Sequence, residues 1–377
     1  MGNIGVKLIV LALLFLYCLV VVYNVVAKEK QWDFQTFYYA AQAHSEGENP
    51  YDVAILSQTA GKEIDLPFVY PPVALYLFRP FALFDYQSAY VLFFILKLAA
   101  FTLLILLWRR HFLCDNNYYV VLLLLFVLAF RETTIRDIYA GNVSSFEQLL
   151  IWLGFLFFLD RKPFAFAILI VASALFKVTS ILFLLLLLLD RDRRSLVALA
   201  AVTLAFGGLH LITYLAKPNL FTSFLANVGS LDERGSINPA SLALIRDILD
   251  AASRWSGHDL CGFDLAIYGF WIGVLVAVGY WVFSRSDLSK QRQSLLYAGL
   301  FLYALALPRF KDYSYILLIV PSLFVVQVVL RSIPIKSVAV AVLCISLFPY
   351  QPLLLALALY LLILRHIRRE SSTAVRG

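Results

Sequence analysis

The sequence has few charged residues for its length. Only 15% of its 377 residues are charged, against roughly 25% in an average soluble domain. Apolar residues make up 62%, where roughly 45–50% is usual. A water-soluble fold cannot bury so much apolar side chain, so soluble globular, disordered and fibrous classes are excluded.

Cysteine is also scarce, and its spacing is uninformative. The four cysteines are Cys18, Cys114, Cys261 and Cys344, and no two form a CxxC pair. This excludes a cysteine zinc site and gives no disulfide framework. No cluster of metal-ligand residues stands out, so no metal site and no cofactor are assigned from the sequence, and the need for a metal stays open. The net charge of +7 does not indicate a nucleic-acid partner, because basic loops of a membrane protein set its orientation.

Apolar runs recur along the whole chain at the length that a membrane-spanning helix needs. They predict an all-α polytopic membrane protein, a single domain over 1–377, with about 12 spans. The first run could instead be a signal peptide, but it is longer than a usual signal sequence. The segment 163–189 is too long for one span, so we expect two short helices that meet at Lys177. Proline-rich Phe68–Phe84 suits a helix at the membrane surface. The runs are 4–27, 88–108, 117–130, 146–159, 163–189, 195–216, 264–283, 294–307, 313–330, 335–348 and 351–364.

The distribution of charge predicts the orientation. With the N-terminus inside, Lys and Arg concentrate in short inner loops, as the positive-inside rule requires. Two long loops, 28–87 and 217–263, then face outward, and the tail 365–377 is cytoplasmic. We therefore expect a multi-pass protein of the plasma (inner) membrane. Its chemistry would lie on the periplasmic or extracellular side, and a transferase there must draw on an activated donor carried in the membrane.

Asp33 is the first candidate for catalysis. It lies just after the first apolar run, among Trp32, Phe34, Phe37 and Tyr38. Partial desolvation by aromatic neighbours favours a carboxylate that acts as general base. The structural alternative is that Asp33 caps a helix beginning at Phe34.

Two further segments of the first outer loop carry polar and aromatic residues. Gly47–Tyr51 includes Asn49 and reads as a turn, and Phe68–Pro72 includes Tyr70 and reads as an interfacial anchor. In order, D-F-x-x-F-Y-x-A-A from Asp33, G-x-N-x-Y and Y-P-P resemble glycosyltransferase family 87.

Later segments extend the resemblance to about residue 315. Ala140–Ser144 is similar to the family's G-[QN]-x-N, with Ser144 in place of the second Asn. Phe176–Ser180 is similar to K-x-x-P, with Ser180 in place of Pro. Asn238–Leu242 with Arg246 is similar to N-Q-S-L…R, with one additional residue. Where family members carry a histidine on a late outer loop, this chain has Leu307–Tyr313, which indicates a different sugar or acceptor contact.

The resemblance implies a fold and a reaction. The fold is a GT-C-like helical bundle, and the activity is transfer of a sugar, mannose in the family, from a polyprenyl-phosphate donor to a lipid or glycan acceptor. Asp33 would be the general base. Apart from the resemblance, Lys177 is a candidate to bind the donor phosphate, because a lysine between two short apolar helices needs an anionic partner. Arg309 and Lys311 are further candidates. The remaining candidates for substrate contact are residues of the matching motifs and two residues of the departing late segment. They are Tyr38, Tyr39, Asn49, Tyr51, Tyr70, Asn142, Asn238 and Arg246 from the motifs, and Asp312 and Tyr313 from the late segment.

Several charged residues have competing interpretations. A lysine between short apolar helices needs an anionic partner, so Lys177 could also be paired within the protein or snorkel. Lys97 has no acidic partner within a predicted span, which favours a structural or lipid-phosphate contact. Arg131 and Arg136 could also bind the donor phosphate, or they could form a solvated face with the adjacent Glu132 and Asp137. Asp190–Arg191–Asp192 resembles a nucleotide-binding D-x-D, but its short inner loop indicates only a topology signal.

Two other functions stay open. A secondary transporter usually shows broken helices in pairs, intramembrane acids and a repeat, and no repeat is visible here. A polymerase or ligase acting on lipid-linked sugars would also use outer loops. The ordered motifs and the early Asp33 favour the transferase.

Overall fold

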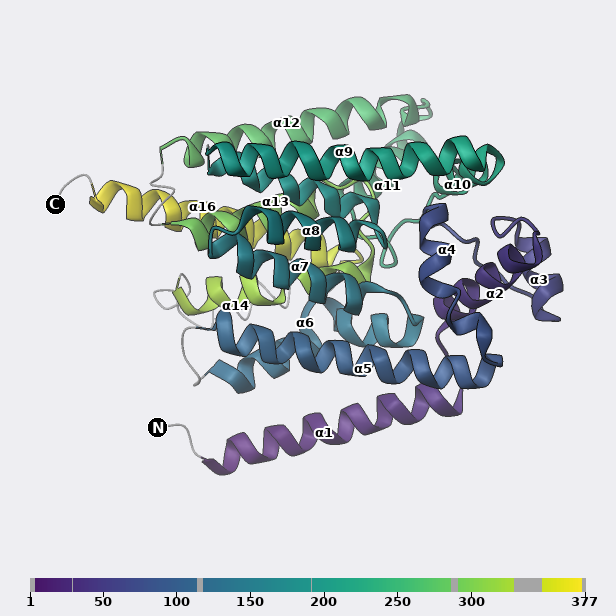
Figure 1. Ribbon diagram of the computed structural model, residues 1–377. Helices are drawn as coiled ribbons and strands as arrows, with labels where there is room; N and C mark the ends of the chain where they lie inside the picture. The colour runs from purple at the N-terminus through teal and green to yellow at the C-terminus, as the bar shows by residue number, and fades with distance from the viewer. Residues whose placement is uncertain are drawn as a thin grey trace. The chain divides into compact units, whose positions relative to one another are not determined.

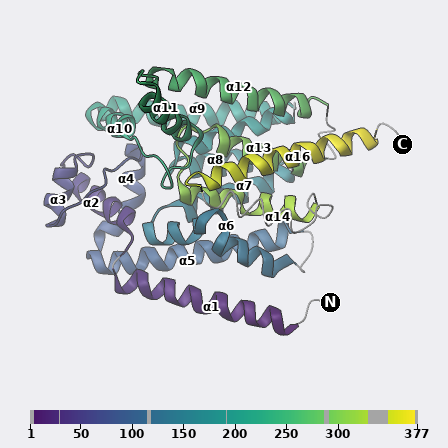
Figure 2. The same ribbon diagram turned by 180° about the vertical axis from the view of Figure 1, so that it is seen from behind.

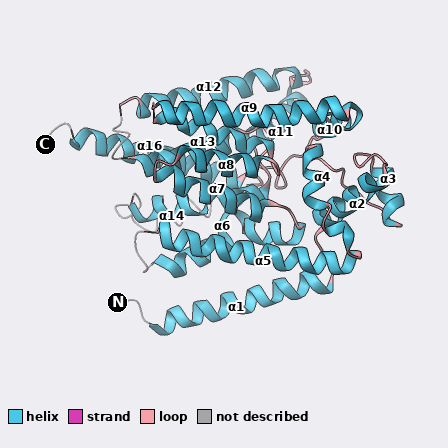
Figure 3. Ribbon diagram, in the orientation of Figure 1, coloured by secondary structure: helices cyan, strands magenta, loops and turns pink. Residues whose placement is uncertain are grey.

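The computed structural model describes residues 4–28, 30–113, 118–190, 192–285, 291–328 and 348–374. Every regular element in these ranges is a helix (Figure 3). This confirms the all-α class. Within the described residues, five segments are long and apolar enough to cross a membrane: Lys7–Glu46, Tyr86–His111, Arg193–Ala216, Cys261–Phe283 and Gln351–Ser371. The count of about 12 spans stays a prediction, and the expected span 335–348 lies, except for its last residue, outside the described residues.

Contacts divide the chain into two compact units. Unit 1 comprises Met1–Leu11, Leu113–Arg136 and Asp232–Gly377, and unit 2 comprises Ala12–Phe112 and Asp137–Leu231. The expectation of a single domain stays a prediction.

Unit 2 is built on a row of apolar helices. In it α7 packs against α5 and α8, and α8 also contacts α9 (Figure 1). At one end of α5 the short helices of the first predicted outer loop gather, as both views show (Figures 1 and 2). The helices are α1 (Ile4–Ala27, mostly in this unit), α2 (Trp32–Glu46), α3 (Val53–Ala60), α4 (Pro72–Phe78), η1 (Phe81–Leu83), α5 (Tyr86–His111), α7 (Ser144–Leu159), α8 (Pro163–Ala174), η3 (Val178–Leu189), α9 (Arg193–Ala216) and α10 (Pro218–Ser230).

Unit 1 holds the C-terminal helices. In it α13 packs on α16 and α12, and α11 packs on α12. The predicted tail from residue 365 continues α16 as far as Ala374, so it is helical over its described part. The helices are α11 (Ser241–Ser256), η4 (Cys261–Phe263), α12 (Asp264–Phe283), α13 (Arg292–Ala306), η5 (Asp312–Leu318), α14 (Ile319–Val328) and α16 (Gln351–Ala374).

One helix, α6 (Tyr119–Ala140), is divided between the units and broken inside. Residues Ala129–Glu132 depart from helical geometry, and Phe130, Arg131 and Glu132 have φ of 51°, 60° and 61°. Left-handed backbone at consecutive residues other than glycine is costly. The predicted span 117–130 therefore ends at this break, and a second helical segment follows where a loop was expected.

Aromatic packing fixes α2 within unit 2. The Phe34 ring stacks on Phe93 of α5 with centroids 4.3 Å apart, and the Phe37 ring stacks on Phe78 of α4 at 4.6 Å. Burial of such rings stabilises a fold by roughly 1.5–3 kcal/mol each. Because α2 is anchored on this face, the side chain of Asp33, one residue before Phe34, is held in a fixed direction.

Candidate active site

Asp33 lies in the first turn of α2 and is buried, with 8% of its surface exposed. The helix begins at Trp32 with Gln31 as its cap residue, so the expectation that Asp33 caps a helix from Phe34 was wrong. Trp32 is nearly half exposed, whereas Phe34, Phe37 and Tyr38 are buried as expected. The Asp33 carboxylate does not cap the helix and instead points toward Asn142, another residue of unit 2.

Asn142 is a hydrogen-bond partner of the Asp33 carboxylate. Its Nδ2 donates to Asp33 Oδ2 over 2.6 Å and to the Tyr70 hydroxyl oxygen over 2.9 Å. All three residues were sequence candidates, and they come from three separate segments. The carboxylate therefore lies against an amide that fixes its orientation, with a phenol beside it.

Gly141 allows this approach. Its φ is 67°, and a Cβ at that position would lie 2.4 Å from Gln31 Cβ, a distance that atoms do not tolerate. The backbone N–H of Gln31 also donates to Tyr139 O over 2.7 Å. Only glycine fits where the start of α2 and the Tyr139–Asn142 turn come this close. This gives the Ala140–Gly141–Asn142 motif a physical reason.

Lys177 is joined to the same network through Ser144. Its ammonium donates to Ser144 Oγ over 2.7 Å, and Ser144 Oγ in turn donates to Asn142 Oδ1 over 2.9 Å. Lys177 also forms an ion pair with Glu147, at 2.9 Å, and Ser180 donates to that carboxylate over 2.8 Å. As predicted, Lys177 lies between two short helices, α8 and η3.

Lys97 and Asp137 complete the charged groups of this cluster. The Lys97 ammonium lies 2.5 Å from Asp137 Oδ2, neither side chain is exposed, and Lys97 also donates to the backbone oxygen of Asn142. The structural contact expected for Lys97 is confirmed. The acidic partner of Lys97 lies outside the predicted spans, since Asp137 follows the run 117–130. The expectation that Asp137 belongs to a solvated face was wrong, because its side chain is fully buried against Lys97.

The network therefore holds three carboxylates and two ammonium groups. The carboxylates are those of Asp33, Asp137 and Glu147, and the ammonium groups are those of Lys97 and Lys177. Sequence reasoning missed Lys97, Asp137 and Glu147 as members. Glu147 offered a signal, because it is an acid at the start of a predicted span and therefore needed a buried cation.

The other predicted residues of unit 2 form hydrogen bonds and ring contacts around this cluster. Tyr51 donates its hydroxyl to Tyr70 O over 2.8 Å, and Asn49 Nδ2 lies 3.4 Å from Ser223 Oγ on α10. Tyr38 donates to Phe84 O over 2.8 Å, and Tyr39 stacks on Tyr86. These contacts hold the helices of the segment 28–87 together.

The remaining predicted residues lie in unit 1. Arg309 and Lys311 both pair with Glu233, at 2.7 Å each. Burial alone would raise the pKa of Glu233, but the two cations lower it. Asn238 links this loop to the next, since it donates to Glu233 O over 2.9 Å and accepts from the Phe310 N–H over 2.9 Å.

Asp312 and Tyr313 follow directly after these basic residues. Arg136 pairs with Asp312 at 2.8 Å, and the Lys311 ammonium lies over the Tyr313 ring. Arg136 is thus paired across unit 1 and does not belong to a solvated face with Asp137.

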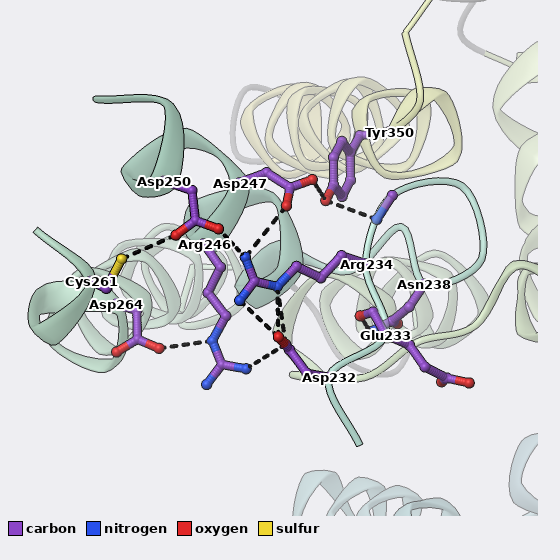
Figure 4. A network of polar contacts seen from close by, with 11 residues as sticks. Asp232, Glu233, Arg234, Asn238, Arg246, Asp247, Asp250, Cys261, Asp264 and Tyr350 are labelled. Carbon is purple, nitrogen blue, oxygen red and sulfur yellow. Dashed lines mark hydrogen bonds and ion pairs between the residues drawn. The ribbon is translucent and has the colours of Figure 1, made fainter. Parts of the chain in front are cut away.

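Arg246 belongs to a network of ion pairs on α11 (Figure 4). It binds Asp264 at 2.8 Å and Asp232 at 3.2 Å. Arg234 binds Asp232 at 2.8 Å and also pairs with Asp250. Hydrogen bonds from Arg234 lower the pKa of Asp232. The network closes the 232–235 loop onto α11.

Comparison with known families identifies the chain. A family model of glycosyltransferase family 87 matches residues 68–308, which is more than half of the sequence. The chain belongs to glycosyltransferase family 87. No curated protein and no solved structure matches it. Membership in glycosyltransferase family 87 implies a sugar donor and an acceptor as substrates.

The matched residues of glycosyltransferase family 87 include most of the network. Tyr70, Asn142 and Lys177 lie inside the matched range, and Asp33 precedes it. The D-x-D-like segment has a structural explanation: Asp192 caps α9 by accepting from Ser195 N over 2.8 Å, while Arg191 lies outside the described residues.

Proposed function

We propose that the chain transfers mannose from a polyprenyl-phosphate donor to a lipid or glycan acceptor at the outer face of the plasma membrane, with Asp33 as general base. Family membership supports sugar transfer. The apolar helices support work within a membrane. The donor, the acceptor class, the side of the membrane and the role of Asp33 are our proposal.

The proposed role of Asp33 as general base rests on its hydrogen bond with Asn142. A buried carboxylate held at 2.6 Å by an amide donor is fixed in one direction. The amide shares an N–H with Asp33 Oδ2 in a hydrogen bond but does not give up the proton, so the carboxylate stays ionised and can accept a proton from an acceptor hydroxyl. A lipid phosphate leaves without a strong general acid, so a base and a phosphate-binding cation meet the chemical needs of the reaction.

Lys177 is our proposed cation for the donor phosphate. It lies in the same network as Asp33, through Ser144 and Asn142. It is also partly exposed, with 19% of its side chain accessible, whereas Lys97 has none. Arg309 and Lys311 stay proposals for the same role, with Glu233 as the group that a phosphate must displace.

Transfer of radiolabel from polyprenyl-phosphate mannose tests the proposal. Membranes with the wild-type chain should form a labelled lipid or glycan that membranes without the chain do not form. An equal signal in both membranes would contradict the proposed donor. A polymerase or ligase would instead consume lipid-linked oligosaccharide and leave the monosaccharide donor untouched.

A further inference from the structure

The buried pair of Lys97 and Asp137 has no assigned task in the proposed reaction. Lys97 comes from the middle of α5, and Asp137 lies five residues before Asn142. Their charged atoms are 2.5 Å apart, and both side chains are fully buried. Taking two charges out of water is costly, and apolar replacements of buried pairs are often as stable or more stable. Stability alone therefore does not account for the pair.

The pair holds the turn that carries Asn142. Lys97 donates to the backbone oxygen of Asn142 and pairs with the side chain of Asp137, so one ammonium group binds both ends of the turn. Between them, Gly141 N and Asn142 N both donate to Asp137 O, at 3.0 and 3.4 Å. The direction of the Asn142 amide, and thus its contact with Asp33, depends on this turn.

We propose that Lys97 and Asp137 are positioning residues, which fix the Asp137–Asn142 turn so that the Asn142 amide orients the Asp33 carboxylate. They do not touch the reacting atoms. The inference rests on the proposed function, because it assigns them a part in keeping the base in place. A displacement of about 1 Å at a reacting group can cost about 100-fold in rate.

The first test replaces both charges together. Lys97→Met with Asp137→Leu should leave a folded protein with an unchanged or raised Tm, because no single charge is left buried. Its kcat should fall by about 100-fold, with the KM for donor little changed. The matched control is Lys162→Met with Asp160→Leu, an exposed pair of the same unit. This control should keep the wild-type kcat.

The second test separates positioning from a general structural role. In an Asn142→Ala background the contact with Asp33 is already absent, so replacing the pair should cost less than about threefold more. An equal loss of kcat in both backgrounds would overturn the proposal, as would wild-type kcat in the pair variant. If the apolar pair does not fold, Lys97→Gln with Asp137→Asn is compared in the same two backgrounds. It removes both charges but keeps polar side chains, and its loss of kcat should again be smaller in the Asn142→Ala background.

The outcome is distinguishable from failure of the proposed function. If Asp33→Asn is inactive while the pair variant has wild-type kcat, only the positioning proposal fails. If Asp33→Asn keeps full activity, the proposed base fails, whatever the pair variant does.

Discussion

Lys177 and Glu147 should affect donor use in opposite directions. Their side chains form an ion pair at 2.9 Å, and Lys177 also donates to Ser144 over 2.7 Å. If Lys177 binds the donor phosphate, Glu147 competes with that phosphate for the same ammonium. Lys177→Ala should therefore raise the KM for donor, while Glu147→Gln should lower it. Lys177→Arg should lie near wild type, since the role is charge.

The magnitudes follow from the kinds of contact. Loss of a charge-assisted hydrogen bond costs about 1.5–3 kcal/mol, which corresponds to roughly a 10- to 150-fold rise in KM for Lys177→Ala. The gain from Glu147→Gln is smaller. Glu147 is buried, but Lys177 keeps 19% of its side chain exposed. Solvent therefore screens the ammonium, and with the upper value for screened pairs, about 1 kcal/mol, KM should fall by about fivefold at most.

Donor saturation curves of purified variants measure these changes, with Tm as the check on folding. Lys177→Ala leaves Glu147 buried without its cation, so the double variant Lys177→Ala with Glu147→Gln should recover the Tm but keep the high KM. Lys162→Ala, at an exposed lysine, is the control. A rise in KM for both single variants, recovered in the double variant, would show that the pair is structural and that the phosphate lies elsewhere.

Three further outcomes are expected. Asn142→Ala should lower kcat by roughly 10- to 100-fold at an unchanged fold, because Asp33 loses a charge-assisted contact; transfer assays with matched folded protein check this. Arg234→Ala should lower the Tm by a few degrees at pH 7, and by less near pH 3. The lowered pKa of Asp232 gives stability that is present above the usual carboxyl value of about 4 and is lost as the pH falls through the lowered value; melting curves over pH check this. Finally, in a cysteine-free background, a single cysteine at 238 should react with a membrane-impermeant reagent added outside, whereas one at 193 should not. Labelling of position 193 from outside would contradict the topology.

Composition and apolar runs were sufficient to predict the helical class and the apolar helices. The meeting of two helices at Lys177 was also predictable, because a run of this length with a central lysine does not fit one span. The break in α6 was not predictable. Its left-handed residues are Phe130, Arg131 and Glu132, and none of them is a glycine or proline that would indicate a turn. The number of spans stays a prediction.

The site was partly accessible from the sequence. Asp33 and Lys177 were candidates from their places beside apolar runs, and the resemblance added Tyr70 and Asn142. The structure brings all four into one network. Their contacts join residues as much as 109 positions apart, which no local pattern encodes.

The partners of the lysines were harder to predict. Asp137 looked solvated beside Arg136, but the two side chains turn to different partners, Lys97 and Asp312. Side-chain direction at the end of a broken helix depends on the break itself, so spacing alone could not separate them.

The rate of sugar transfer by Asp33→Asn tests the central claim most directly. Asn keeps the size of the side chain and can still meet Asn142, but it cannot accept a proton from an acceptor hydroxyl. With purified protein matched for folded fraction, transfer from the polyprenyl-phosphate sugar should fall by about 100- to 10,000-fold, the usual contribution of a general base. Asp33→Glu should be intermediate, because its carboxylate is displaced by one methylene. Activity of Asp33→Asn within about threefold of wild type would mean that Asp33 is structural and that the base lies elsewhere.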